Sequence, residues 1–193
     1  MTGRDDMLTI RLESPRLVLR PLEMQDAPRI ETLADDPAIA MNLLTMPHPY
    51  PPGAAEEFIT RVRESLAAGE GYVLAITLKP DDDLIGIIGL HPHKEPQHRK
   101  AELGYWLGIP YWNGGYITEA ARCMLELGFR SLGLNRIYAS HFIDNPASGR
   151  VMQKLGMTYE GTLRQHWYRG DRYRDTAYYG ILREDYEQLA RSE

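Results

Sequence analysis

The spacing of apolar and polar positions along the chain predicts a mixture of strands and amphipathic helices. Runs rich in β-branched and aromatic residues predict strands at 16–21, 72–78, 84–90, 101–109, 137–143, 157–168 and 173–182. Apolar residues at helical spacing predict helices at 27–34, 58–66, 117–131 and 146–155. A proline-rich loop, MPHPYPP, separates the first two helices.

The order of these elements constrains the fold. Three strands follow one another between residues 72 and 109 with no helix between them, which argues against a purely parallel, doubly wound sheet. The stretch 79–83, KPDDD, predicts a hairpin turn, and Arg169-Gly170-Asp171 predicts a second one. We therefore predict a mixed α/β (α+β) fold.

Composition narrows the class of protein. A chain of 193 residues with 43% hydrophobic and 25% charged residues is typical of one globular domain, which we expect over residues 1–193 with a flexible stretch at 1–12. The net charge of -5 argues against nucleic acid as the main partner. The sequence has neither a secretory signal nor an apolar run of the ~20 residues that a membrane helix needs. We expect a cytoplasmic protein that binds neither nucleic acid nor membrane.

A glycine-bearing turn joins the strand at 101–109 to the next helix. Gly114 and Gly115 leave room for a ligand, and the first turn of the helix presents unpaired N–H groups with a partial positive charge. This combination binds phosphate oxygens without a lysine. The turn matches neither a P-loop nor a dinucleotide fingerprint. On these residues alone, a phosphate site and a plain strand-to-helix connection are both open.

A second segment, residues 144–157, follows the next strand. Asn145 suits the N-cap of a helix, Pro146 its first position and Gly156 its end. Capping accounts for these residues. However, Asn145 and Ser148 also stand just after a strand end, where sites in α/β proteins usually form.

In this order and spacing, the two segments resemble the GNAT superfamily of acetyl-CoA-dependent N-acyltransferases, and most closely its Rim-type branch of ribosomal-protein N-terminal acetyltransferases. The resemblance extends from the stretch ESPRLVLRP at 13–21 to YGILREDY at 179–186. It implies a central, mostly antiparallel sheet of six to seven strands, splayed in the middle, with about four helices. It also implies acetyl-CoA as cosubstrate and no metal.

The resemblance implies a role for each part of these segments. The family's pyrophosphate loop falls on 112–117, with its fixed glycine at Gly115, and its splayed fourth strand, which pairs with the pantetheine arm, falls on 103–109. Ile117 departs from the family pattern, and we expect its side chain to turn into the core. The residues implied for acetyl-CoA binding are Leu103, Tyr105, Trp106, Leu107, Asn113, Gly114, Gly115, Tyr116, Ile117, Thr118, Asn145 and Ser148.

The resemblance also implies that an amine attacks the acetyl thioester directly. Glu102 is the candidate base, acting through water, and Ser148 is the candidate donor to the leaving thiol. Each has a structural alternative, because Glu102 suits a solvated strand end and Ser148 suits a helix cap. His141 is an alternative base, although strand histidines are more often structural. Tyr105 could face the acceptor pocket, but it better suits core packing. Cys123, the only cysteine, stands on an apolar helix face, so we expect no covalent acyl-cysteine route.

Three histidines, His91, His93 and His98, cluster around two prolines, but without a carboxylate triad they do not favour a metal site. The expected acceptor is a protein N-terminus or a small cationic amine, because acidic and aromatic residues occupy the segments that flank the pantetheine end in the family. They are Asp35, Asp36, Tyr50, Glu56, Glu57, Trp167 and Tyr168. The competing hypothesis is a non-catalytic acyl-CoA sensor on the same fold. The C-terminal hairpin also offers edges for a homodimer.

Overall fold

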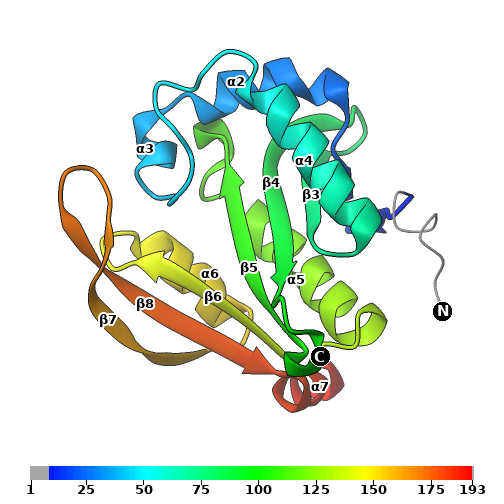
Figure 1. Ribbon diagram of the computed structural model, residues 1–193. Helices are drawn as coiled ribbons and strands as arrows, with labels where there is room; N and C mark the ends of the chain where they lie inside the picture. The colour runs from blue at the N-terminus through cyan, green and yellow to red at the C-terminus, as the bar shows by residue number, and fades with distance from the viewer. Residues whose placement is uncertain (1–8, 193) are drawn as a thin grey trace.

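The computed structural model describes residues 9–192, and within them it has one eight-stranded sheet in the order β1-β2-β3-β4-β5-β6-β8-β7 (Figure 1). The strands are β1 (Leu12–Glu13), β2 (Leu17–Pro21), β3 (Tyr72–Leu78), β4 (Asp83–Pro92), β5 (Lys100–Leu107), β6 (Arg136–Phe142), β7 (Thr158–Tyr168) and β8 (Tyr173–Leu182). All neighbours are antiparallel except β5 and β6. The predicted mixed, mostly antiparallel fold is confirmed, with β1 as an additional strand.

Six α-helices lie within the same residues, two more than expected. They are α2 (Ala27–Ala34), α3 (Pro37–Ala40), α4 (Ala54–Ala68), α5 (Tyr116–Glu126), α6 (Pro146–Lys154) and α7 (Arg183–Ser192). Shorter 3-10 turns are η1 (Met24–Asp26), η2 (Pro96–His98) and η3 (Ile109–Tyr111), and the π-helical turn η4 (Leu127–Ser131) continues α5. The single-turn helix α3 and the C-terminal α7 are the additions to the predicted set.

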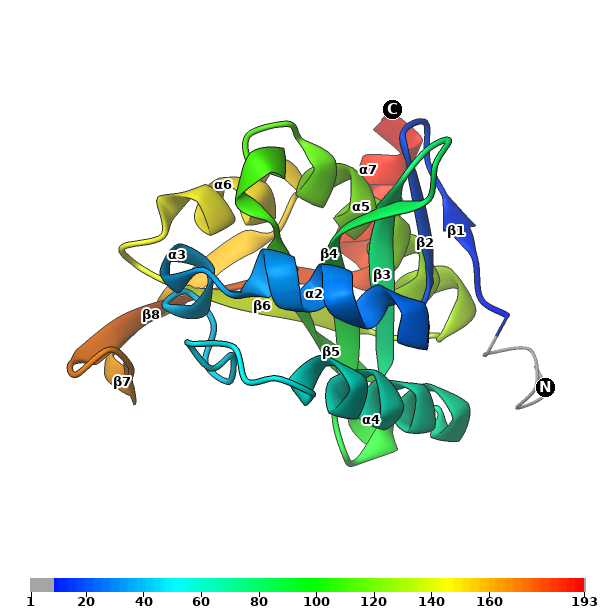
Figure 2. The same cartoon turned by 90° about the horizontal axis from the view of Figure 1, so that it is seen from above.

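The helices cover the two faces of the sheet unequally. Helices α2 and α4 lie on one face, here called the α4 face, and α5, α6 and α7 lie on the other, the α5 face (Figure 2). Each face has its own core: Ile87 and Trp106 belong to the cluster under α2 and α4, whereas Leu103 and Leu107 belong to the larger cluster under α5. The alternation along β5 therefore sorts its side chains between two different surroundings.

The sheet opens between β5 and β6. These parallel strands pair only over three positions, from Lys100 opposite Arg136 to Glu102 opposite Tyr138, although both strands continue further. Figure 1 shows them starting together and then diverging. The backbone edge of β5 beyond Glu102 consequently has no strand partner on the β6 side. This is the splayed sheet expected from the resemblance.

The stretch expected to be flexible, residues 1–12, falls in two parts. Residues 1–8 lie outside the described residues, whereas Ile10 and Leu12 pack against the larger core. Among residues 9–192, helices long and apolar enough to cross a membrane are absent.

Candidate functional site

Glu102 lies at the point where the sheet opens. It is the last residue of β5 that pairs with β6, and its neighbour on the other side is His91 of β4. Partial burial raises the pKa of the Glu102 carboxyl, and a hydrogen-bonding interaction with Ser140 only partly offsets that rise. A solvated strand-end carboxylate would not experience such desolvation, so the position suits a proton acceptor.

A row of polar side chains extends from Glu102 along the α4 face. Ser140 on β6 stands directly opposite Tyr178 on β8, and the Tyr178 hydroxyl is hydrogen-bonded to Nε2 of His166 at 3.1 Å. Burial raises the pKa of the Tyr178 and Tyr138 phenols, and the nearby Glu102 charge raises both further. The carboxylate therefore lies in a polar environment that reaches the exposed strand β7.

Two glycines lie next to Glu102 on the α4 face. Gly89 on β4 and Gly104 on β5 are cross-strand partners, and neither places a side chain there. The ring of His91 lies over them, because a Cβ built on Gly89 would be 3.2 Å from its Nε2 and one on Gly104 would be 3.8 Å away. His91 is exposed at the surface, but neighbouring protein partly desolvates its imidazole and lowers the imidazole pKa. The lowered pKa favours the neutral form of the imidazole that covers these glycines beside Glu102.

The other predicted residues of β5 divide between the two faces. Leu103 and Leu107 are buried under α5, and Trp106 packs in the cluster under α2 and α4. Tyr105 lies on the α5 face, where burial raises the pKa of its hydroxyl to about 12, and the hydroxyl donates to the Ser148 carbonyl at 3.4 Å. The packing role expected for Tyr105 is therefore observed, together with a link to α6.

The glycine-bearing turn has the backbone shape that its sequence suggests. Asn113 has φ 61°, and Gly115 has φ 78° at the N-cap of α5, so both occupy the left-handed region. A Cβ on Gly114 would lie 2.6 Å from the ring of Tyr116. Ile117 packs against the larger core, as expected. The first turn of α5, which also carries Thr118, keeps its backbone N–H groups available.

A clamp from the beginning of the chain holds this turn. The Arg16 guanidinium donates to the Gly114 carbonyl at 3.0 Å and to Glu119 at 2.7 Å, and it stacks over the ring of Tyr116. Ser14 donates to the same Glu119 carboxylate at 2.8 Å. Burial alone would raise the pKa of Glu119, but the bonds from Arg16 and Ser14 outweigh it and lower the pKa. The sequence patterns do not predict this clamp, although Ser14 and Arg16 belong to the stretch ESPRLVLRP in which the family resemblance begins.

Asn145 and Ser148 form the N-terminal cap of α6. The Asn145 side chain accepts a hydrogen bond from the Ser148 N–H at 3.4 Å and donates to the Ser148 hydroxyl at 3.2 Å. Both side chains are half-buried. The cap explains their local role, and the Ser148 hydroxyl retains a proton to donate.

The surroundings of two further candidates, His141 and Cys123, favour a structural role over a catalytic one. The His141 ring lies on the α5 face against Gly149, with Nδ1 2.8 Å from the Phe142 carbonyl, so β6 separates it from Glu102. Cys123 is half-buried against the larger core, where burial raises the pKa of its thiol. A raised pKa makes a poor nucleophile.

The residues expected to attract the acceptor have mixed roles. Asp35 accepts from the Tyr50 N–H at 2.8 Å and lies 3.1 Å from His48, and Asp36 caps α3. Tyr50 packs under α2 and α4, whereas Trp167 is 40% exposed. Glu56, Glu57 and Tyr168 are also exposed. The two aspartates thus shape the loop instead of lining a pocket.

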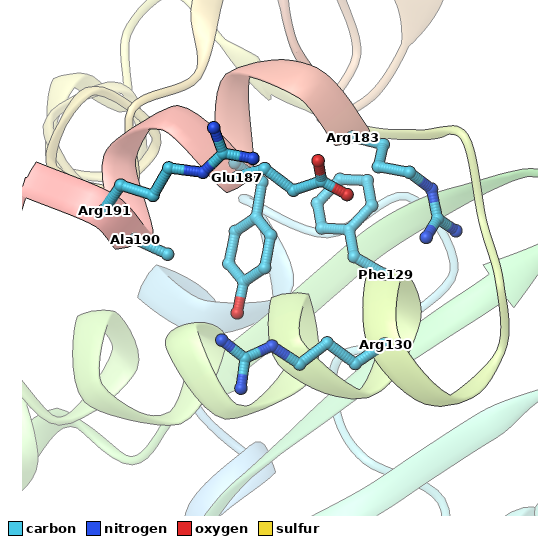
Figure 3. Close-up of a pocket in the computed structure, with 7 residues that line it drawn as sticks. Phe129, Arg130, Arg183, Glu187, Ala190 and Arg191 are labelled. Atoms are coloured by element: carbon cyan, nitrogen blue, oxygen red, sulfur yellow. The ribbon is translucent and has the colours of Figure 1, made fainter.

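Two cavities lie away from Glu102. One of about 240 Å³ separates α7 from the turn η4, with Arg130, Arg183 and Arg191 around it (Figure 3). Arg130 is paired with Glu126 at 2.8 Å, and Arg183 donates to the Leu134 carbonyl. The other, of about 700 Å³, lies between the end of α4 and the β4–β5 turn.

A splayed sheet beside a glycine turn at a helix N-terminus defines the class of protein, and the family comparison agrees. The model of the acetyltransferase (GNAT) domain matches residues 16–158. The chain therefore belongs to the GNAT family and is an acetyltransferase. GNAT acetyltransferases use acetyl-CoA.

Several relatives support this assignment. The chain is 33% identical to the uncharacterized N-acetyltransferase YoaA of Bacillus subtilis, over 89% of this chain and 96% of that protein. It is 32% identical to the ribosomal-protein-serine acetyltransferase of Escherichia coli, over 58% and 62% of the two chains. Among solved structures, a GNAT acetyltransferase from Bacillus anthracis is 26% identical with a TM-score of 0.77, covering 91% of this chain and 99% of that one. RimJ of Mycobacterium smegmatis, solved with CoA-disulfide, shares the fold at a TM-score of 0.82 and 22% identity over 95% and 93%.

Proposed function

We propose that this chain transfers the acetyl group of acetyl-CoA directly to a primary amine, with a protein N-terminus or a small-molecule amine as acceptor. The observation that carries the proposal is the position of Glu102. A partly desolvated carboxylate of raised pKa stands where the sheet opens, at the last position of β5 that pairs with β6. An acceptor that approaches through this opening meets a base.

The residues present fit acetyl-CoA. The turn at Gly114 and Gly115, here called the glycine cradle, leads into the positively polarised end of α5, and a Cβ at Gly114 would collide with the Tyr116 ring that packs against the turn. The backbone edge of β5 beyond Glu102 is free to pair with an extended amide-bearing chain. We assign the cradle to Asn113–Thr118, the free edge to Leu103–Leu107, and the far wall to Asn145 and Ser148.

Bound acetyl-CoA supplies the thioester that the acceptor attacks. Glu102 removes a proton from the acceptor ammonium through water, because a raised pKa matches a base to near-neutral pH. Backbone N–H groups on the free edge of β5 polarise the carbonyl. Ser148 donates a proton to the departing sulfur and recovers it from solvent.

A protein N-terminus is the acceptor class that we favour. The polar row from Glu102 through Ser140 and Tyr178 ends at exposed residues of β7, which leaves a path for an extended peptide. The name of the Escherichia coli relative points the same way. Homodimer formation through β7, an edge strand with exposed Leu163 and Trp167, stays a prediction that light scattering would test.

The deciding experiment measures thiol release from acetyl-CoA. The panel contains N-terminal peptides, polyamines, amino acids and aminoglycosides, each with the wild-type chain. We expect release with at least one amine and none without an amine. Binding of acetyl-CoA by calorimetry with no release on any amine would instead support the acyl-CoA sensor, and preference for an anionic amine would contradict the acceptor class.

A further inference from the structure

The turn between β4 and β5 gathers two histidines and one carboxylate. Nδ1 of His93 lies 2.6 Å from Oε2 of Glu95, and Nε2 of His98 lies 3.7 Å from the same oxygen. One ligand atom from each residue lies within 4.8 Å of the others. His91, which the sequence groups with them, instead faces the site beside Glu102.

The backbone of the turn fixes this convergence. The His93 N–H donates to the Lys100 carbonyl at 2.9 Å and closes the turn at its base. Pro96 begins the 3-10 turn η2, and the His98 N–H donates to the Glu95 carbonyl at 3.1 Å. Arg99, the nearest guanidinium along the chain, is bonded to the Gly133 carbonyl. The three ligand-type side chains are therefore held on one short loop while that cation is occupied elsewhere.

We propose that His93, Glu95 and His98 form a binding site for a divalent transition metal ion such as zinc or nickel. Two imidazoles and a carboxylate are ligands that these ions prefer. Ligand atoms on a tetrahedral zinc ion, with bonds of about 2.0–2.1 Å, stand ~3.3 Å apart, so small side-chain rotations suffice. Three protein ligands leave at least one position for water.

The site is separate from the acetyl-transfer chemistry proposed above, which uses none of these three residues. Its effect is on the turn itself. At present the two imidazoles contact one carboxylate. A bound ion would replace these contacts with three metal–ligand bonds and so hold the turn that precedes β5. Because the ion binds the folded chain and the turn does not exist in the unfolded one, it raises the melting temperature.

Calorimetric titration of Zn²⁺ and Ni²⁺ into the full chain without a histidine tag tests this proposal. We expect one ion per chain, a rise in melting temperature, and an absorption band of tetrahedral or five-coordinate Co²⁺ when cobalt is the probe. H93Q, E95Q and H98Q should each weaken binding at least about 10-fold, since loss of even an outer-shell partner costs that much.

The matched control is H48Q, which removes another half-exposed imidazole that lies beside an aspartate. Its metal affinity should equal that of the wild type. Circular dichroism of each variant confirms that the fold is kept, and the readout does not depend on acetyl transfer. Binding no tighter than about 1 mM in the wild type, or undiminished in H93Q and H98Q, would overturn the proposal.

Discussion

At the residue scale, the role as base that we propose for Glu102 depends on its surroundings. Burial at the opening of the sheet raises the pKa of its carboxyl, and the Ser140 interaction opposes that rise. A base with a raised pKa accepts a proton more readily near neutral pH. The same burial makes the ionised form unfavourable in the folded protein. Function and stability therefore have opposite requirements at this position.

E102Q separates these two requirements. We expect kcat to fall by about 10²- to 10⁴-fold, the usual contribution of a general base, while acetyl-CoA affinity changes little. The wild-type kcat/KM should rise with pH through a pKa above the ordinary range of glutamate, and E102Q should lack that rise. The control is E64Q on the exposed face of α4. A wild-type profile without such an ionisation would contradict the assignment.

The effect of E102Q on stability shows whether a loss of activity comes from the missing base or from unfolding of the protein. A carboxyl whose pKa is raised by folding destabilises the protein at pH values above that pKa, where it must ionise in the folded state. Glutamine carries no such charge. At neutral pH, E102Q should consequently melt at the same temperature as the wild type or higher, as measured by calorimetry.

The sequence predicts Glu102 and the glycine turn but not their supports. Glu102 begins the segment that resembles the family's acetyl-CoA site, and Gly114 and Gly115 predict a turn. Ser140, Tyr178 and His166 come from three other strands, and their meeting depends on strand order and register, which local patterns do not encode. Sequence spacing groups His91 with His93 and His98, because it does not reveal which way a side chain points.

At the element scale, the N-terminal turn of α5 depends on residues that precede β2. The Glu119 carboxylate, whose side chain is 17% exposed, accepts bonds from the backbone and guanidinium of Arg16 and from Ser14. A carboxylate in the first turn also interacts favourably with the helix dipole. The clamp thus fixes the helix end that we assign to the pyrophosphate.

E119Q tests the clamp. Loss of its charge-assisted hydrogen bonds should cost about 1–2 kcal/mol at neutral pH and raise the KM for acetyl-CoA. Because folding lowers the pKa of Glu119, its contribution is present above the unfolded pKa of about 4.3 and is lost as the pH falls through the lower folded pKa. The difference in melting temperature between wild type and E119Q should therefore shrink at acid pH. The control is E126Q, which removes the exposed i,i+4 ion pair between Glu126 and Arg130. It should change the free energy of unfolding by only ~0.3–0.5 kcal/mol.

The elements that the sequence does not predict are too short or too polar to show a periodic pattern of apolar residues. β1 has two residues and α3 has four, which is shorter than a strand or helical repeat requires. α7 reads REDYEQLARS, a polar string in which Tyr186 and Leu189 are the large apolar positions. Its packing comes from tertiary contact, since Tyr186 stacks on Phe129 with ring centroids 4.9 Å apart.

At the scale of the whole molecule, the opening between β5 and β6 divides the sheet into two halves, β1 to β5 and β6 to β8. A contact bridges these halves on the side where they diverge. The tip of the β7–β8 hairpin, Arg169–Arg172, reaches the segment around α3 that belongs to the other half (Figure 1). Arg169 donates to the Ala40 carbonyl at 2.8 Å and to the Met46 carbonyl, and a Cβ on Gly170 would fall 1.9 Å from Met41. Arg174, stacked on Phe142, donates to Met41 and Asp144.

This bridge should control access to Glu102 because it joins the two halves on the side that we propose for the acceptor, without touching the glycine cradle. We expect R169A to raise the acceptor KM several-fold, while calorimetry finds acetyl-CoA binding unchanged. Hydrogen exchange of residues 40–52 should quicken, since Ala40 and Met46 lose a shared donor. The matched control is R172A in the same tip, because the Arg172 side chain is 63% exposed and pairs with Asp144 instead of the segment around α3. If R169A and R172A changed the acceptor KM equally, the bridge would have no part in acceptor binding, and general loosening of the hairpin would explain the effect.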